Sequence, residues 1–193
     1  IIQYIKTGVP PTTENNGCSN NQSSPFGDWR NIVCFIADDD DSNLHLTDAE
    51  ELADTMKFFH EEYNVDKIYL DAYKQESTPG GERYPDVNDA IDKRLEKGCL
   101  ILNYTGHGGE VGLAHERIVD ISQINKWSNF NNLPLFFTAT CEFSRYDDPN
   151  RTSAGEYSFL NPKGGAIALF TTVRLVYASF NSDLNLSFYK NAF

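Results

Sequence analysis

The chain has 193 residues, of which 40% are hydrophobic and 13% aromatic, and this composition is typical of a folded globular domain and not of a disordered chain. Its 28 acidic and 16 basic residues give a formal net charge of −12 at pH 7. Because phosphate groups are bound by basic clusters, this charge argues against nucleic acid as a partner and against simple electrostatic docking on an anionic membrane. No stretch of the sequence reaches the roughly 18 apolar residues of a membrane span.

The first 28 residues have the composition of a linker. A short apolar run at 1–5 is followed by Pro10 and Pro11 and then by stretches rich in Asn and Ser. The N-terminus lacks the layout of a signal peptide, and the first residue is Ile1, so we expect an excised or processed chain. We predict a linker or a junction with a preceding domain at 1–28 and one folded domain at 29–193.

The domain is predicted to begin with a strand and a helix. Residues 32–37 are continuously apolar, which is typical of a strand covered on both faces, and they run into the acidic stretch 38–41. Thr47 and Glu50 have the spacing of a capping box, and apolar residues follow at helical spacing as far as Phe59.

A second pair of elements follows the first. Residues 67–70 are predicted to form a strand, and 74–84, which include Pro79-Gly80-Gly81, a loop. Asp86 is expected to cap a helix that ends at Gly98.

The next two predicted strands both end in a residue that can do chemistry. The strand at 99–104 stops at His107, which has three glycines around it and therefore little shielding. The strand at 135–140 stops at Cys141, where polar sequence takes over. The carboxyl ends of parallel strands share one crevice, so the two side chains can meet, and a thiol beside an imidazole is an activated nucleophile. The alternative is a glycine-rich turn and an inert, half-buried cysteine.

The rest of the chain continues the alternation. We expect a short helix at about 119–128, a helix capped by Ser153 and Glu156, a strand at 165–172 and a final helix from about 182. Strands that alternate with helices predict an α/β fold with a mainly parallel sheet flanked by helices, in which five strand ends face one crevice.

The segment Asn103-Tyr104-Thr105-Gly106-His107-Gly108, followed by an apolar strand that ends in Cys141, resembles the gingipain-type cysteine peptidases, which share the caspase-like fold. The resemblance covers about residues 29–193. It implies that Cys141 attacks a peptide carbonyl and forms a thioester, that His107 transfers the proton, and that the backbone amides of Gly108 and Cys141 hold the oxyanion. It implies neither a metal nor a cofactor.

Gingipains also carry an acidic residue, shortly after the first strand, that orients the histidine. Alignment on the end of that strand places Asp40 at this position, with Asp39 as the near alternative, although gingipains have glutamate there. Two other interpretations of the stretch 38–41 stay open. It is a solvated acidic loop or a cation site, since clustered carboxylates suit Ca²⁺ even though the EF-hand pattern is absent.

Within the family, residues 138–149 are most similar to the sortases, or C-terminal signal peptidases, of the type IX secretion system of Bacteroidetes. That similarity implies cleavage before the C-terminal signal domain of secreted cargo and transfer of the acyl group to an amine of anionic lipopolysaccharide. It also implies an outer-membrane-associated location at the cell surface and other type IX components as partners. Residues 142–148 differ from those of gingipains, so the gingipain preference for arginine or lysine has no support in this stretch.

Two functions of other classes compete with a cysteine peptidase. The first is a catalytically silent caspase-like module that binds cargo or partner subunits. The second is a metal-dependent hydrolase that uses Asp38 to Asp41.

Several other residues have two interpretations. His115 has a structural role or lines the pocket near His107. Four charged residues past the strand ends contact substrate or form a surface ion-pair network: Arg145, Asp147, Asp148 and Arg174.

Three of the four cysteines lie outside the predicted site. Cys34 and Cys99 are predicted to be core residues, and Cys18, in a polar loop, is free to pair elsewhere. Four aromatic residues are also expected in the core: Tyr104, Phe136, Phe137 and Phe170.

Overall fold

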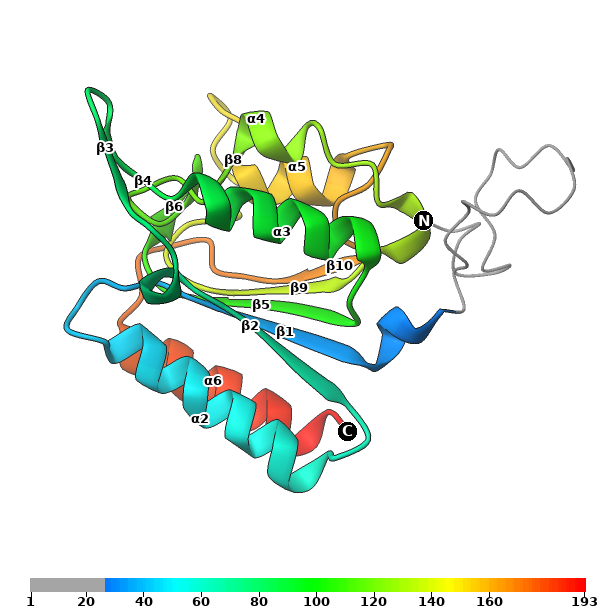
Figure 1. Cartoon of the computed structure of the whole chain (residues 1–193). Helices are drawn as coiled ribbons and strands as arrows, with labels where there is room; N and C mark the ends of the chain where they lie inside the picture. The colour runs from blue at the N-terminus through cyan, green and yellow to red at the C-terminus, as the bar shows by residue number, and fades with distance from the viewer. Residues whose placement is uncertain (1–26) are drawn as a thin grey trace, which may run out of the picture.

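The computed structural model describes residues 27–193, and its centre is a five-stranded sheet in the order β10-β9-β5-β1-β2 (Figure 1). All neighbouring strands of this sheet are parallel. The strands are β1 (Ile32–Ala37), β2 (Asn64–Tyr69), β5 (Ile101–Thr105), β9 (Leu135–Ala139) and β10 (Ala168–Phe170). The predicted α/β fold with a mainly parallel sheet is confirmed. Cys18 and nearly all of the predicted linker lie outside the described residues.

Helices cover both faces of the sheet (Figure 1). On one face lie α2 (Leu44–Phe59) and α6 (Ala178–Asn191), and on the other α3 (Pro85–Lys97), α4 (Ile121–Ile124) and α5 (Ala154–Leu160). The central strand β1 contributes side chains to both helix layers, because successive side chains of a strand point to opposite faces of the sheet. Phe35 packs in the cluster under α2 and α6, whereas Ile36 packs in the cluster under α3. This double burial explains the unbroken apolar run of β1.

The start of α2 differs from the prediction. The helix begins at Leu44, and its first turn has no side-chain cap, so the capping box expected at Thr47 and Glu50 is wrong. Asp41, Ser42 and Asn43 all have positive φ, and this left-handed stretch brings the chain into the helix one turn early. Thr47 then lies inside the helix and donates to the Asn43 carbonyl at 2.8 Å.

Two other helix starts can be compared with their predicted caps. In α3 the helix starts at Pro85, so Asp86 lies in the first turn and is not the cap. The capping box of Ser153 and Glu156 at α5 is confirmed.

Several short elements were predicted wrongly or missed. The predicted loop at 74–84 contains the hairpin β3 (Glu76–Thr78) and β4 (Gly81–Arg83). The predicted helix at 119–128 shrinks to the four residues of α4, capped by Asp120. The last strand is only 168–170, and α6 starts at 178 and not at 182.

The chain after His107 also carries structure that the sequence did not predict. It forms a small sheet of β6 (Gly108–Gly109), β7 (Gly112–Leu113) and β8 (Val119–Asp120). The loop that presents the histidine is therefore held by its own strand pairing.

The core predictions are mostly confirmed. Cys34 and Cys99 are fully buried, as are the rings of Tyr104, Phe136 and Phe137. Phe170 is 43% exposed, so its predicted core position is wrong, because β10 is the edge strand. No helix in the part of the chain that the structure describes is both long and apolar enough to cross a membrane.

Candidate active site

The two predicted catalytic residues come from neighbouring strands in the middle of the sheet. Thr105 at the end of β5 lies opposite Ala139 at the end of β9. His107 and Cys141 each follow two residues later, and both line one cavity of about 190 Å³. The structure thus brings the predicted pair together at the carboxyl edge of the sheet.

Cys141 is half-buried and lies at a sharp turn. Glu142 has a φ of 50°, a left-handed conformation that an L-residue adopts only when its surroundings impose it. Its amide donates to the Arg174 carbonyl at 3.3 Å, and the Cys141 Sγ donates to the Val176 carbonyl at 3.5 Å. The segment between β10 and α6 therefore holds both the turn and the thiol.

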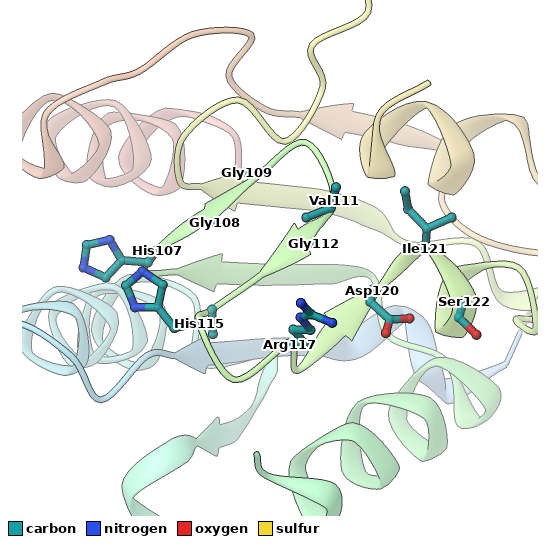
Figure 2. A pocket seen from close by; sticks show the side chains of 11 residues that line it. His107, Gly108, Gly109, Val111, Gly112, His115, Arg117, Asp120, Ile121 and Ser122 are labelled. Carbon is teal, nitrogen blue, oxygen red and sulfur yellow. The ribbon is translucent and has the colours of Figure 1, made fainter. Parts of the chain in front are cut away.

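His107 is fixed through its ring and its backbone. Its Nε2 lies 2.9 Å from Asp41 Oδ2, its amide donates to Asp38 Oδ2 at 2.8 Å, and its carbonyl accepts from the Tyr104 hydroxyl at 2.6 Å. The ring stacks on His115 at a centroid distance of 5.1 Å, as Figure 2 shows. Because a carboxylate only accepts, Asp41 favours the proton on Nε2 and leaves a lone pair on Nδ1.

No hydrogen bond joins His107 to Cys141 within residues 27–193. The imidazole contacts Asp41, and the thiol contacts the Val176 carbonyl. The two groups therefore share a cavity without a direct contact.

The acidic residue beside His107 is not the predicted one. Asp40 contacts His115 Nδ1 at 2.9 Å, and Asp39 accepts from the Tyr84 hydroxyl at 2.6 Å. Asp41 takes the position against His107, because the left-handed turn that starts at Asp41 folds its carboxylate back over the strand ends.

The Asp40 contact has an electrostatic effect on its own partner. The hydrogen bond that Asp40 accepts from His115 raises the pKa of His115 above its usual value, and burial opposes the shift. His115 lines a cavity beside His107, so the second of its two interpretations is confirmed.

The two predicted oxyanion donors come from different loops, Gly108 directly after His107 and Cys141 after β9. A side chain at Gly108 would come within 2.6 Å of Thr140 Oγ1, so glycine is required for the close approach of the two loops. The amide of Cys141 has no backbone acceptor among residues 27–193. Gly108 lines a different cavity from Cys141, so the structure does not bring the two amides into one pocket.

That second cavity is the larger one, at about 570 Å³, and Figure 2 looks into it. His107 and His115 close one end, and Arg117, Asp120 and Ser122 lie along it toward α4. Because His107 lines both cavities, a bound chain that crosses the imidazole has room on each side.

The residues of the Cys141 cavity that the sequence analysis did not place there include the polar side chains of His45, Asp48 and Asn181. His45 and Asp48 are three residues apart on α2 and so share a face of the helix. The sequence shows this spacing, but it does not show that this face of α2 lies beside Cys141. Burial raises the pKa of Asp48, and a hydrogen bond from Ser182 opposes the shift.

Two groups of side chains in the described residues converge closely enough to hold a metal ion. One consists of Asp41, His45 and His107, and the other of Asp38, Asp39 and Glu116. The first group includes the imidazole of the candidate dyad. The second group includes Asp38, which accepts the backbone amide of His107.

The charged residues past the strand ends form the ion-pair network that was one of their two interpretations. Arg174 pairs with Asp147, and Arg145 lies 3.4 Å from Glu142 and 3.9 Å from Asp148. The Arg174–Asp147 pair joins the segment after β10 to the segment after Cys141, and the two Arg145 contacts lie within the latter.

Comparison with known proteins gives the family of the chain. Residues 14–193 match the family model described as peptidase family C25. No curated protein matches the chain.

Solved structures share the fold. The crystal structure of the Arg specific cysteine proteinase gingipain R (RgpB) has a TM-score of 0.63 at 17% identity, covering 84% of this chain and 37% of that one. The complex of Porphyromonas gingivalis RgpB pro- and mature domains gives 0.62 at 18% identity, with 83% and 38% covered. A structure described as a protease gives 0.56 at 16% identity, with 82% and 32% covered. The chain thus spans less than two fifths of the length of these proteins.

Proposed function

The chain belongs to peptidase family C25, the family of the gingipain-type cysteine peptidases, and we propose that it cleaves peptide bonds with Cys141 as nucleophile and His107 as general base. One observation carries this proposal. The paired strands β5 and β9 deliver the imidazole and the thiol into the same cavity from positions two residues past their ends.

The chemistry follows from the groups present. The Cys141 Sγ forms a bond to the substrate carbonyl carbon while its proton passes to His107 Nδ1. The Asp41 carboxylate stabilises the resulting imidazolium through Nε2. The carbon–nitrogen bond then breaks, the imidazolium gives its proton to the leaving amine, and a thioester remains on Cys141.

The tetrahedral intermediate needs donors for its oxyanion. We assign this role to the amides of Gly108 and Cys141, each of which is worth a few kcal/mol when aimed at a developing negative charge. Gly108 packs closely against Thr140, the residue before Cys141, so the two loops that carry these amides are already neighbours.

We further propose that the protein acts as a sortase similar to PorU, the C-terminal signal peptidase of the type IX secretion system. The similarity of residues 138–149 supports this role. Its substrates are then exported cargo proteins with C-terminal signal domains, and its setting is the cell surface with other type IX components. The 570 Å³ cavity beyond His107 supports transfer, because it gives room for an acceptor amine of lipopolysaccharide to attack the thioester in place of water.

A second candidate activity is hydrolysis after a basic residue. It is favoured by Asp48, which lines the Cys141 cavity and offers a carboxylate to a positively charged side chain. It also agrees with the arginine specificity named for the similar gingipain R.

The first test is the rate of Cys141 alkylation by iodoacetamide at pH 7, read by mass spectrometry in the native chain and in His107→Ala. Cys34 and Cys99 serve as internal controls, because burial raises the pKa of both thiols. The pKa of Cys99 rises to about 12, and that of Cys34 also lies well above its usual value. We expect Cys141 to react at least about tenfold faster than either control, and the substitution to slow it. An equal rate in both proteins rejects the dyad and leaves a silent binding module.

A peptide panel separates the two activities. Peptides with Arg, Lys or Ala before the scissile bond are incubated with and without a primary amine, and the products are identified by mass spectrometry. Amine-linked product supports the sortase, whereas free acid from basic peptides alone, lost in Asp48→Asn, supports the hydrolase.

A further inference from the structure

The peptide unit that joins Thr140 to Cys141 is held by two side chains. Its carbonyl, on Thr140, accepts from the Thr172 hydroxyl at 2.5 Å and from Asn181 Nδ2 at 3.4 Å. Thr172 follows β10, and Asn181 lies on α6. The group next to the candidate nucleophile is therefore fixed by donors that lie 32 and 41 residues further along the chain.

The two contacts differ in strength. The Thr172 contact is short for a hydrogen bond between oxygens, whereas the Asn181 contact is long for an N–H donor. Thr140 and Asn181 are both buried, and Thr172 is half-buried. Because water has little access to this place, it does not readily replace a lost donor. We therefore expect the Thr172 hydroxyl to be the main support of the carbonyl.

The backbone of Thr172 is tied to the same turn. Its carbonyl accepts from the Ser144 amide at 3.1 Å, and the Arg174 carbonyl accepts from the Glu142 amide at 3.3 Å. Thr172 thus contacts the chain before Cys141 through its hydroxyl and the chain after Cys141 through its carbonyl. Removal of the hydroxyl alone leaves both backbone contacts in place.

The direction of the Thr140 carbonyl also sets the direction of the Cys141 amide. The peptide unit is trans and planar, so its C=O and its N–H point to opposite sides. The N–H of Cys141 therefore points away from the two donors that hold the carbonyl. Within residues 27–193 this N–H donates to no backbone or side-chain acceptor. It is a donor that a bound substrate can use.

We propose that Thr172 and Asn181 are positioning residues that aim the Cys141 amide at the oxyanion of the tetrahedral intermediate. The inference rests on the proposed function, in which this amide is one of the oxyanion donors. Neither side chain has to contact the substrate oxygen for this role. A donor that is already aimed stabilises the developing charge without reorienting at the moment of reaction.

Loss of the Thr172 hydroxyl leaves the carbonyl with the long Asn181 contact alone. The peptide unit then gains freedom to rotate about the two bonds that flank it, and the Cys141 N–H is aimed at the oxyanion for less of the time. Binding of the uncharged substrate depends little on this direction, whereas the transition state depends on it strongly. We therefore expect a fall in kcat with KM close to native.

Three variants test the role of the hydroxyl. Thr172→Val removes it with little change of shape, and Thr172→Ser restores it. Thr171→Val is the matched control, because the Thr171 hydroxyl is buried and has no hydrogen-bond partner among the described residues. Asn181→Leu removes the other donor and tests the same carbonyl if Thr172→Val does not fold.

The first measurement is the NMR shift of the Thr140 carbonyl carbon and of the Cys141 amide nitrogen, both of which respond to a hydrogen bond at that carbonyl. We expect both signals to move in Thr172→Val, to return toward native in Thr172→Ser and to stay native in Thr171→Val. This comparison needs neither substrate nor cleavage.

The second measurement compares two reagents that attack the same thiol. A peptide aldehyde, made from the peptide cleaved fastest in the panel, adds the Cys141 Sγ to its carbonyl carbon, and the carbonyl electron pair moves to the oxygen that the amide faces. Iodoacetamide loses iodide as Sγ bonds to its methylene carbon, and no oxyanion forms. We expect Thr172→Val to weaken aldehyde affinity and to lower kcat, each about tenfold or more, with the alkylation rate unchanged.

Three results overturn the proposal. They are native NMR signals in both Thr172→Val and Asn181→Leu, equal losses of aldehyde affinity and alkylation rate, or a Thr172→Ser variant that behaves like Thr172→Val. Equal losses would mean that Thr172 acts on the thiol or on the fold as a whole. Failure of the proposed function has a different signature, which is equal alkylation of the native chain and His107→Ala, and it does not alter the NMR comparison.

Discussion

At the scale of single residues, the four adjacent aspartates after β1 each contact a different group. Asp38 accepts the backbone amide of His107, and Asp41 contacts the ring of the same histidine. Asp39 and Asp40 contact Tyr84 and His115 instead. One histidine is thus oriented by two aspartates, one for its backbone and one for its ring.

Asp41→Asn therefore tests the orientation of the imidazole. An amide in place of the carboxylate stabilises the imidazolium less and accepts a hydrogen bond less strongly, so we expect peptidase kcat to fall roughly tenfold or more with little change in KM. Asp40→Asn is the matched control and leaves kcat nearly unchanged. A larger loss in Asp40→Asn than in Asp41→Asn contradicts the assignment.

The Asp40 contact makes its own prediction about pH. The hydrogen bond that Asp40 accepts from His115 raises the pKa of His115 above its usual 6.5. The contact therefore stabilises the fold fully below that pH, and this stabilisation is lost as the pH rises through the pKa of the folded state. The effect on stability is small, because the His115 side chain is 73% exposed. An NMR titration is the sensitive measurement. Asp40→Asn is expected to return the His115 midpoint toward 6.5, whereas an unchanged midpoint rules the contact out.

The residues that the sequence predicted best are those that depend on strand ends. His107 and Cys141 were found because each follows an apolar run, and a parallel sheet brings such ends together. Asp41 was missed because its position depends on left-handed backbone angles, which counting along the chain does not show. Glu116 has no motif at all, and only the folded loop places it beside Asp38.

At the scale of elements, α5 shows how a short helix is fixed beside the site. The Ser153 hydroxyl and amide both donate to the Glu156 carboxylate at 2.8 Å, and the Glu156 amide donates back to Ser153. The next amide, of Ala154, donates to the Glu110 carbonyl at 2.8 Å. The start of α5 is therefore joined to the segment that follows the histidine.

Ser153→Ala is expected to lower the free energy of unfolding by about 1 kcal/mol, the usual cost of losing a cap. Urea denaturation followed by circular dichroism measures it. Thr47→Ala is the control, because the Thr47 hydroxyl only bonds the carbonyl four residues before it within α2. Equal losses in the two variants would show that the capping box contributes nothing of its own.

Long elements were more predictable than short ones for a physical reason. The strand at 32–37 is buried on both faces, so its sequence alone indicates its structure. The two-residue strands β6, β7 and β8 have no periodicity to detect, and they exist because the loops around Gly108 pair with one another. Phe170 was misplaced because nothing in an apolar strand sequence says that it lies at the edge of the sheet.

At the scale of the whole molecule, the sheet order sets where the site lies. From β1 the chain moves outward to β2 on one side and then returns to add β5, β9 and β10 on the other. The reversal lies between β1 and β5, and open parallel sheets bind ligands at such a point. Asp38 follows one of these strands and His107 the other, so the candidate dyad lies beside the reversal.

The C-terminal helix α6 is joined to the central strand β5 by buried hydrogen bonds. Asn103 on β5 donates to Asn185 Oδ1 on α6 at 2.8 Å and to the Tyr189 hydroxyl at 3.2 Å, and Asn185 donates back at 3.3 Å. Both asparagines are fully buried. They join segments 82 residues apart. Because both side chains are buried, bulk water does not reach them to replace a lost hydrogen-bond partner.

A double-mutant cycle measures this link. Asn185→Leu alone leaves the Asn103 amide short of a partner, and Asn103→Leu does the same to Asn185, so each is expected to cost about 1–3 kcal/mol of unfolding free energy. The double variant removes both polar groups, and we expect it to cost less than the sum of the two by at least about 0.5 kcal/mol. Strict additivity in denaturant unfolding would mean that the two side chains stabilise the fold independently. In that case the hydrogen bonds between Asn103 and Asn185 add nothing to the contacts of Tyr189 that hold α6 to β5.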